Sequence, residues 1–435
     1  MTTRYHEIPR PLFNALAVGR GGPDAINELA AAQLSKNVIL LRGVLAVARD
    51  VGGAQARCAG LGWEVLTEVE RYNHQIATRV TRYPAVGAWA MRTLLGLKDA
   101  DRSPEAVPSR LAAVAAAAVV RSGLDAEVPV LPVAGVVSLP SLGAAQVDAD
   151  SAVVRSRAGR AEVRWARGRV EIPSEAQRDA PGWMGVRRCQ AGRLEAVIDD
   201  LDPFRMPSVE GLAPRLTAEE AWHWEMTLRQ GWQVLATGHP GLAAEVAAAI
   251  SVIVPLTRSE YRQRNSSSPE TFGAVAMSEP TDPDTCASAL AHELQHVKLG
   301  AILDIVKLTL PDDGRRYYAP WRPDPRPTAG LLQGAYAFLG VTEFWRRQRQ
   351  LATGAAQLRA DGEFALWRAG TVRVIDTLLS SNRLTTIGRD FVQRMSEAAS
   401  AWADESVSAQ AQAGALRESR RHLARWEMAN GPVPS

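Results

Sequence analysis

The chain has 435 residues, of which 46% are hydrophobic and 22% are charged, and it carries a formal net charge of +3. This composition is ordinary for a globular protein and argues against a disordered one. The charge is too small for this length to predict a nucleic-acid partner or an anionic membrane surface, because no local basic cluster accompanies it.

The first twenty residues, "MTTRYHEIPRPLFNALAVGR", scatter charges where a secretory signal would have an unbroken apolar run. The longest apolar run, "LAAVAAAAVV" from Leu111, is about half the length that a bilayer needs. We therefore expect a cytoplasmic protein without a membrane partner. The cysteines are odd in number and widely spaced, which predicts reduced thiols: Cys58, Cys189 and Cys286.

The first part of the chain, residues 1–125, is predicted to be helical. After the turn signal "GRGGPD", Asp24 can cap a helix whose apolar positions, from Ile26 to Leu45, recur with a period near 3.6. Further helices are expected around residues 53–82, 84–98 and 104–123.

Residues 126–206 are predicted to form a small β-rich insert. In "AEVRWARGRVEI", Val163 and Trp165 precede Gly168 and Val170 and Ile172 follow it, which is typical of a hairpin. A further strand is expected after Gly192. Helical periodicity then returns at Thr217, a suitable N-cap, and dominates residues 207–435. The expected class is α+β, predominantly helical, with the β-rich insert in the middle.

The pattern with the most chemical content is "HELQH", on a helix expected over residues 284–308 with Asp284 or Thr285 as its cap. Residues four apart project side by side on a helix, so His292 and His296 can present imidazole nitrogens to one metal ion. Glu293 lies one step around the helix, close enough to touch a ligand on that metal. The pattern is typical of zincins, which also have a strand beside the metal helix, and "TFGAVAMS" from Thr271 is predicted to be that strand.

A catalytic metal needs a third protein ligand, and the helix expected from Thr328 offers candidates. Its polar or small positions fall within about 80° of one another on an otherwise apolar helix: Gln333, Tyr336, Gly340, Glu343 and Arg347. If this stripe faces the metal, Glu343 is the preferred third ligand and Gln333 a weaker substitute, because a neutral amide binds metals less well than a carboxylate. The alternative is a solvated helix face.

The loop "RRYYAPWRPDPRP" joins the two helices and places Arg322 and Arg326 beside Tyr318. Arginine suits bidentate capture of a carboxylate, and the prolines reduce the entropy that is lost in holding it. The alternative is a surface loop in which both arginines pair with Asp324.

These segments together resemble a known family. "HELQHVKLGAILDIV", "YYAPWRPDPRP" and "GLLQGAYAFLGVTEFW" are similar to the HExxH-motif proteins that modify ribosomally synthesised peptides in bacterial biosynthetic clusters. The resemblance is strongest over residues 271–347 and extends weakly to "GGPDAINELAAAQLSKNVILLRG" near the N-terminus. The family is described as α-ketoglutarate-dependent peptide β-hydroxylases.

This resemblance implies Fe(II) in place of zinc, with α-ketoglutarate and O2 as co-substrates and a precursor peptide as the partner. His292, His296 and Glu343 would be the iron ligands, which is the two-histidine, one-carboxylate set of non-haem oxygenases. Arg322 or Arg326 would hold the distal carboxylate of α-ketoglutarate, with Tyr318 and Gln333 beside it. Glu293 would orient a ligand or the substrate.

Two other functions fit the same residues. A zinc metallopeptidase would use the same ligands, with Glu293 as the general base that activates water. A metal-free peptide-binding protein would keep the fold without the chemistry. The intact histidines and glutamate argue against the second of these.

Overall fold

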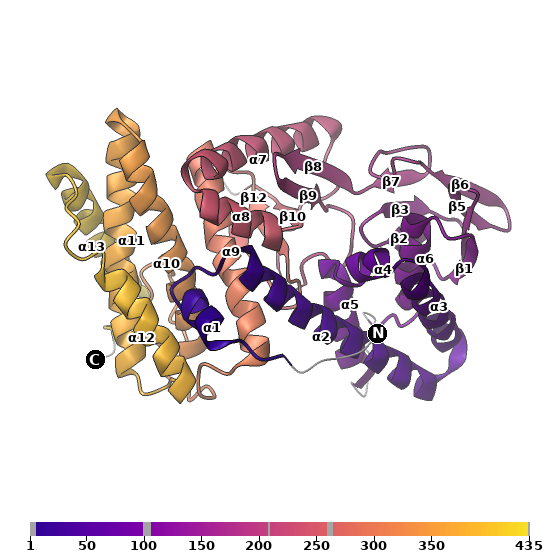
Figure 1. Cartoon of the computed structure of the whole chain (residues 1–435), viewed down its shortest axis with the longest axis horizontal. Coiled ribbons are helices and arrows are strands. Elements are labelled where there is room, and N and C mark those ends of the chain that lie inside the picture. The colour runs from indigo at the N-terminus through magenta and orange to yellow at the C-terminus, as the bar shows by residue number, and fades with distance from the viewer. Residues whose placement is uncertain (1–5, 99–105, 208, 259–263, 434–435) are drawn as a thin grey trace.

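The computed structural model describes residues 6–98, 106–207, 209–258 and 264–433. Helices dominate this part of the chain, and three small sheets interrupt them, so the predicted α+β, predominantly helical class is confirmed. Figure 1 shows α1 (Arg10–Ala17) against the C-terminal helices, with α2 (Gly22–Val51) running from there to the N-terminal helices.

The helices beyond the first two fall into an N-terminal group, a central group and a C-terminal group. They are α3 (Gly53–Tyr72), α4 (His74–Thr81), α5 (Pro84–Lys98), α6 (Arg110–Ser122), α7 (Ala218–Gly238), α8 (Pro240–Ala249), α9 (Pro283–Ile305), α10 (Thr328–Leu351), α11 (Gly354–Ser380), α12 (Thr386–Ser400) and α13 (Ala409–Asn430). The helix expected over 53–82 is two helices, because Asn73 leaves the helical conformation and caps α4 with its side chain.

The described strands form sheets of four, three and five strands. They are β1 (Ala126–Val130), β2 (Val136–Leu139), β3 (Gly143–Gln146), β4 (Ala152–Arg157), β5 (Arg160–Trp165), β6 (Gly168–Ile172), β7 (Trp183–Gly185), β8 (Arg187–Ala191), β9 (Leu194–Ile198), β10 (Val252–Leu256), β11 (Asn265–Ser266) and β12 (Ala274–Ser278). The sheet orders are β1-β4-β5-β6, β2-β3-β7 and β11-β12-β10-β9-β8. The predicted hairpin around Gly168 is confirmed, with Val163 opposite Val170.

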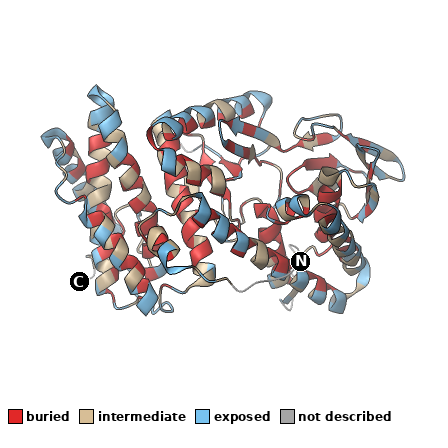
Figure 2. Cartoon of the chain, in the orientation of Figure 1, coloured by how far each residue is buried: buried red, intermediate tan, exposed pale blue. Residues whose placement is uncertain are grey.

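The five-stranded sheet separates two hydrophobic cores. Strands β10 and β12 are parallel and fully buried, and successive side chains of a strand point to opposite faces. Ile253 and Val275 therefore pack with α7 to α12, whereas Val254 and Ala276 pack with the N-terminal helices and the insert. Figure 2 shows this buried interior, with the outer faces of α7 and α13 exposed.

The β-rich insert is continuous with the C-terminal half of the chain through this sheet. The hairpin of β8 and β9 belongs to the segment 126–206, yet β9 pairs in parallel with β10, with Val197 opposite Val252. The predicted boundary between residues 206 and 207 thus separates strands that share one sheet.

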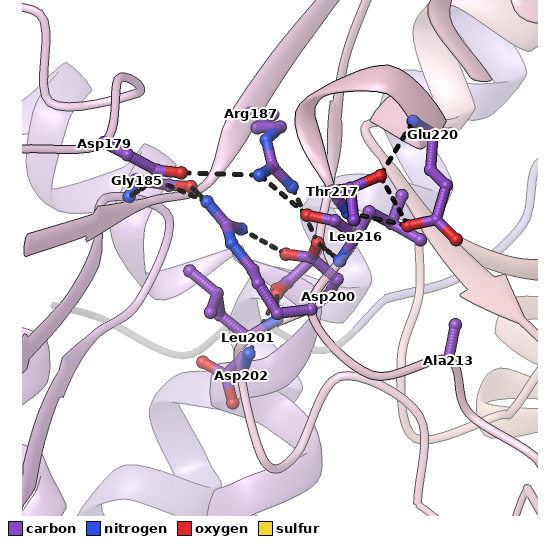
Figure 3. A network of polar contacts seen from close by, with 12 residues as sticks. Asp179, Gly185, Arg187, Asp200, Leu201, Asp202, Ala213, Leu216, Thr217 and Glu220 are labelled. Carbon is purple, nitrogen blue, oxygen red and sulfur yellow. Dashed lines mark hydrogen bonds and ion pairs between the residues drawn. The ribbon is translucent and has the colours of Figure 1, made fainter. Parts of the chain in front are cut away.

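A buried carboxylate fastens this hairpin to the chain that precedes α7 (Figure 3). The side chain of Asp200 is fully buried and accepts hydrogen bonds from Arg187, Arg215 and the backbone N–H of Leu216. Both arginines also contact Asp179 of the insert. Because a buried charge is tolerated only when it is paired and hydrogen-bonded, this network joins three segments of the chain.

Among the described residues, α2 is the one helix long and apolar enough to cross a membrane, and half of its apolar window is buried inside the protein. That burial is common for a core helix.

The contact between α3 and α6 is close enough to require glycine at position 62. A Cβ atom added to Gly62 would lie 2.5 Å from the backbone nitrogen of Ala112, which cannot move aside as a flexible side chain could. On the same helix, a Cβ at Gly60 would meet no atom within 4 Å.

We therefore expect opposite effects from the two alanine substitutions. Gly62→Ala should lower the free energy of unfolding by about 1–3 kcal/mol through overpacking. Gly60→Ala should raise it by up to about 1 kcal/mol, because alanine favours the helix. Denaturant midpoints of the two variants, followed by tryptophan fluorescence, provide the measurement. Equal midpoints would contradict the close packing of α3 on α6.

Candidate metal centre

Helix α9 carries the HExxH residues and begins at Pro283. Asp282 is its N-cap, since the carboxylate accepts a hydrogen bond of 2.9 Å from the N–H of Thr285, and Pro283 follows in the first turn. The cap is thus Asp282, and the expectation of Asp284 or Thr285 is wrong. The helix ends at Ile305, so the predicted span of 284–308 is confirmed in its main part.

The two histidines converge. The Nε2 atoms of His292 and His296 are 3.1 Å apart, and the His292 side chain remains 21% exposed. Two metal–nitrogen bonds of about 2.1 Å span this distance when they meet at about 95°, which suits one metal ion. Burial lowers the pKa of both imidazoles, and for His292 the neighbouring His296 lowers it further. Both rings are therefore favoured in the neutral form that binds metals.

Gln333 orients one of these rings. Its Oε1 lies 3.2 Å from Nδ1 of His296, so in the tautomer that this contact requires Nδ1 donates a proton to the amide. The Nε2 lone pair of His296 then faces His292 and is available to a cation. Gln333 supports a ligand from behind and does not itself point to the common position of the two Nε2 atoms.

Glu293 lies between the two histidines in the sequence and is the remaining defining residue of the HExxH motif. Its carboxyl group is 1% exposed, and Oε1 lies 3.8 Å from Nε2 of His292. Ser267 hydrogen-bonds to the carboxyl group, but Oε2 has no partner among the described residues. Burial raises the pKa of Glu293 to about 8, and the bond from Ser267 only partly opposes this. A buried carboxyl oxygen without a partner, next to two imidazoles, has room for one more donor or cation.

Glu343 does not join the histidines, and its prediction as third ligand is wrong. Its carboxylate contacts Arg20 and Arg346, each at 3.4 Å, and lines a separate cavity. Gln333 lies beside His296, and Glu343 is ten positions further along the same helix, which corresponds to about 15 Å of helix rise. Glu343 therefore cannot reach the site that Gln333 contacts. In the part of the chain that the structure describes, no three His, Cys, Asp or Glu side chains are grouped to hold a metal.

The polar stripe of α10 faces several surroundings, because the helix crosses α9 and passes it. Gln333 reaches the histidines. Tyr336 is buried and donates to the carbonyl of Leu16 at 2.5 Å, while Gly340 packs on Gln295. Arg347 is exposed near Gly238. Neither a solvated face nor a face aimed at the metal describes the whole stripe.

The arginine loop lies over α10, but its charged groups are engaged elsewhere. Arg322 and Arg326 both pair with Asp324, each at 2.9 Å, as the alternative interpretation expected. Tyr318 is buried and its hydroxyl lies 2.9 Å from Nδ1 of His422 on α13, so it does not line the histidine pair.

Aromatic side chains form one wall of the site, which sequence reasoning missed. Phe338 contacts the His292 ring with centroids 5.0 Å apart. Trp321 from the loop stacks on Phe338 at 4.4 Å, and Trp367 of α11 packs on it at 4.4 Å as well. Trp321 fits there because Gly334 leaves space on α10, where a Cβ atom would lie 2.3 Å from the indole nitrogen. No local pattern in the sequence signals such a wall, because its members come from three segments.

A short edge strand lies beside α9. It is β11, which pairs antiparallel with β12. The strand predicted from Thr271 is β12, which is second in the sheet. The strand at the edge beside the helix of the histidines is therefore β11, which precedes the predicted one. Ser267, the hydrogen-bond partner of Glu293, directly follows β11. The edge of the sheet and the histidine pair are thus adjacent.

A scan against models of known protein families and a search of curated proteins both find no match for the chain.

Proposed function

We propose that this chain is an Fe(II)- and α-ketoglutarate-dependent hydroxylase that acts on a side-chain Cβ of a ribosomally synthesised precursor peptide. The observation that carries the proposal is the convergence of His292 and His296, with Nε2 atoms 3.1 Å apart and partly open to solvent. These two imidazoles would hold the iron. Bound Fe(II), α-ketoglutarate and O2 would together supply the oxidising chemistry.

The number of protein ligands places the same demand on both candidate functions. Catalytic zinc sites use three protein ligands, and the described residues offer two histidines without a third group. A chelating co-substrate contributes two oxygen ligands of its own. The non-haem oxygenase set nevertheless also has three protein ligands, so the ligand count alone favours neither candidate.

The surroundings have assignable roles in this proposal. Gln333 would keep Nε2 of His296 directed to the iron. Phe338 and Trp321 would exclude water from one side of the site. Strand β11 is the outermost described strand of its sheet and contacts α9, and the peptide would bind along this side of the sheet.

Arg322 and Arg326 remain the proposed anchor for the distal carboxylate of α-ketoglutarate. Their shared partner Asp324 is 43% exposed, and exposed ion pairs contribute only about 0–1 kcal/mol. Exchange of one carboxylate for another would therefore cost little. The same loop supplies Trp321 to the aromatic wall next to His292.

The second candidate is a zinc metallopeptidase, which the placement of Glu293 favours. A carboxyl oxygen 3.8 Å from Nε2 of a ligand histidine is close to where a general base would meet metal-bound water. Ionisation of this buried group at neutral pH would depend on a cation beside it, because burial, only partly opposed by the bond from Ser267, raises its pKa to about 8.

Reconstitution with metals distinguishes the two candidates. Anaerobic protein with Fe(II) should bind about one metal per chain through the histidine pair. Addition of α-ketoglutarate should produce the weak visible absorption of an iron–keto acid chelate. Co-expression with the precursor peptide should then give a product heavier by one oxygen atom, as mass spectrometry can show. Peptide cleavage with zinc, without the absorption, would favour the peptidase.

Glu293→Gln separates the same candidates by activity. The substitution should reduce a peptidase by about 10²–10⁴-fold, since general-base catalysis is lost. A hydroxylase should keep activity within about tenfold, because an amide still fills the space and donates to neighbours. Glu225→Gln provides a control, since this carboxylate on α7 pairs with Arg229 at 2.6 Å and belongs to no part of the proposed site.

A further inference from the structure

A cavity of about 620 Å³ lies away from the histidine pair, where the N-terminal helices meet the five-stranded sheet. Residues of α4, the end of α6, β9 and the connections into β10 and β12 line it. The volume is in the range of small-molecule sites. Neither the metal centre nor the proposed peptide edge uses this cavity.

Four arginines line the cavity, and three of them, from two helices and a connection, have no ion pair with a described carboxylate. These three are Arg79 of α4, Arg82 directly after α4 and Arg121 of α6. Arg121 is held in place by Ser141, to whose hydroxyl and carbonyl its guanidinium donates at 2.8 and 2.6 Å. The side chains of Arg79 and Arg82 make no ion pair or hydrogen bond with any residue that the structure describes.

The acidic groups near the cavity are bound to other partners. Glu195 contacts Arg188 at 3.7 Å on the rim. Asp199 is fully buried behind Tyr83, whose hydroxyl donates to it at 2.5 Å. Glu195 is thus the one described carboxylate that lines the cavity, and it pairs with Arg188 and with none of the three arginines.

The positive charge of Arg79 makes the charged form of Arg121 less favourable. Burial lowers the pKa of the Arg121 guanidinium, and the charge of Arg79 lowers it further. Burial lowers the pKa of Arg82 as well, which is consistent with a position on a concave wall. Arg121 is partly buried, whereas Arg79 and Arg82 are exposed on the cavity wall. An anion in the cavity would therefore offset the cost of burying Arg121 and would accept charge-assisted hydrogen bonds from the other two.

We propose that this cavity is a binding site for a small organic dianion, either a phosphate monoester or a dicarboxylate. Arg79, Arg82 and Arg121 contact its charged group, because guanidinium forks match the oxygen spacing of phosphate and carboxylate. Phe272, Ala249 and Val197 line the apolar part of the wall and take the carbon portion of the ligand.

Titration calorimetry at fixed ionic strength tests this site with two probes, inorganic phosphate and succinate. We expect at least one of them to bind with one site per chain. Binding of phosphate alone identifies the phosphate class, binding of succinate alone the dicarboxylate class, and binding of both supports the shared dianion chemistry. If neither gives heat beyond that of sodium chloride, the proposal is overturned.

Variants locate the binding. Arg79→Gln and Arg82→Gln should each lower the affinity for the bound probe about tenfold, the usual scale for loss of one charged hydrogen bond. Arg82→Lys keeps the charge without the planar guanidinium, and its affinity for the probe should lie between those of Arg82→Gln and the unchanged protein. Arg157→Gln, on an exposed strand end outside the cavity, is the matched control and should bind as the unchanged protein does. Equal weakening by Arg157→Gln and Arg82→Gln would mean a general charge effect and would overturn the assignment. Circular dichroism spectra report whether each variant is folded.

Discussion

Alanine at either His292 or His296 is expected to weaken binding of Fe(II) or Zn²⁺ by more than about a hundredfold. Loss of a group that merely supports a ligand histidine already costs about 10–100-fold in metal affinity, and loss of the ligand itself should cost more. The measurement is metal content after dialysis against a competing chelator. Because both rings are partly open to solvent, the substitutions should leave the fold intact.

Two further variants make this test specific to the structure. Gln333→Leu removes the acceptor for Nδ1 of His296 and should weaken metal binding by about 10–100-fold. Glu343→Gln changes a carboxylate that contacts Arg20 and Arg346, so metal affinity should not change. A large loss in Glu343→Gln would restore that residue as a ligand and contradict the arrangement of α9 and α10 described above.

The largest loss of stability is expected from Lys298→Met. Lys298 is fully buried in α9, and its ammonium group donates to Glu245 at 2.7 Å and to the carbonyl of Gly19 at 2.8 Å. Methionine fills similar space but leaves the buried Glu245 carboxylate with only the N–H of Gly22 as a partner. Breaking one side of a buried ion pair costs about 3–5 kcal/mol, so the denaturant midpoint should fall accordingly.

The double variant Lys298→Met with Glu245→Leu is the informative companion. With both charges removed, much of the lost stability should return, because the penalty comes mainly from the unpaired charge. Lys307→Met, at an exposed position just after α9, should change the free energy of unfolding by no more than about 0.5 kcal/mol. An equally mild effect at Lys298 would contradict its burial.

This ion pair also bears on the metal centre. Gln295 and Lys298 both donate to the carbonyl of Gly19, so the connection between α1 and α2 is bound to the turn of α9 that carries His296. Residues near the N-terminus therefore support the helix of the two histidines, although some 270 positions separate them. The weak N-terminal resemblance to the peptide-modifying family falls on the helix that follows this connection.

Local features of this chain were determined by its sequence. The helix of His292 and His296, the hairpin around Gly168 and the N-cap at Thr217 all form as predicted. Each depends on residues within one or two turns, where periodicity and capping are decided by side chains close together in the sequence. The side-by-side position of the two imidazoles follows in the same way from their spacing of four residues.

The partners of those features were decided by the tertiary structure alone. The polar stripe of α10 gave no indication of how far the helix slides along α9, and that register places Gln333, and not Glu343, beside His296.

The wall of Trp321, Phe338 and Trp367 and the three-arginine cavity are likewise invisible along the chain. Their members come from separate elements, and only the packing of whole helices against the sheet brings them together, because helix packing is set by the summed fit of many side chains.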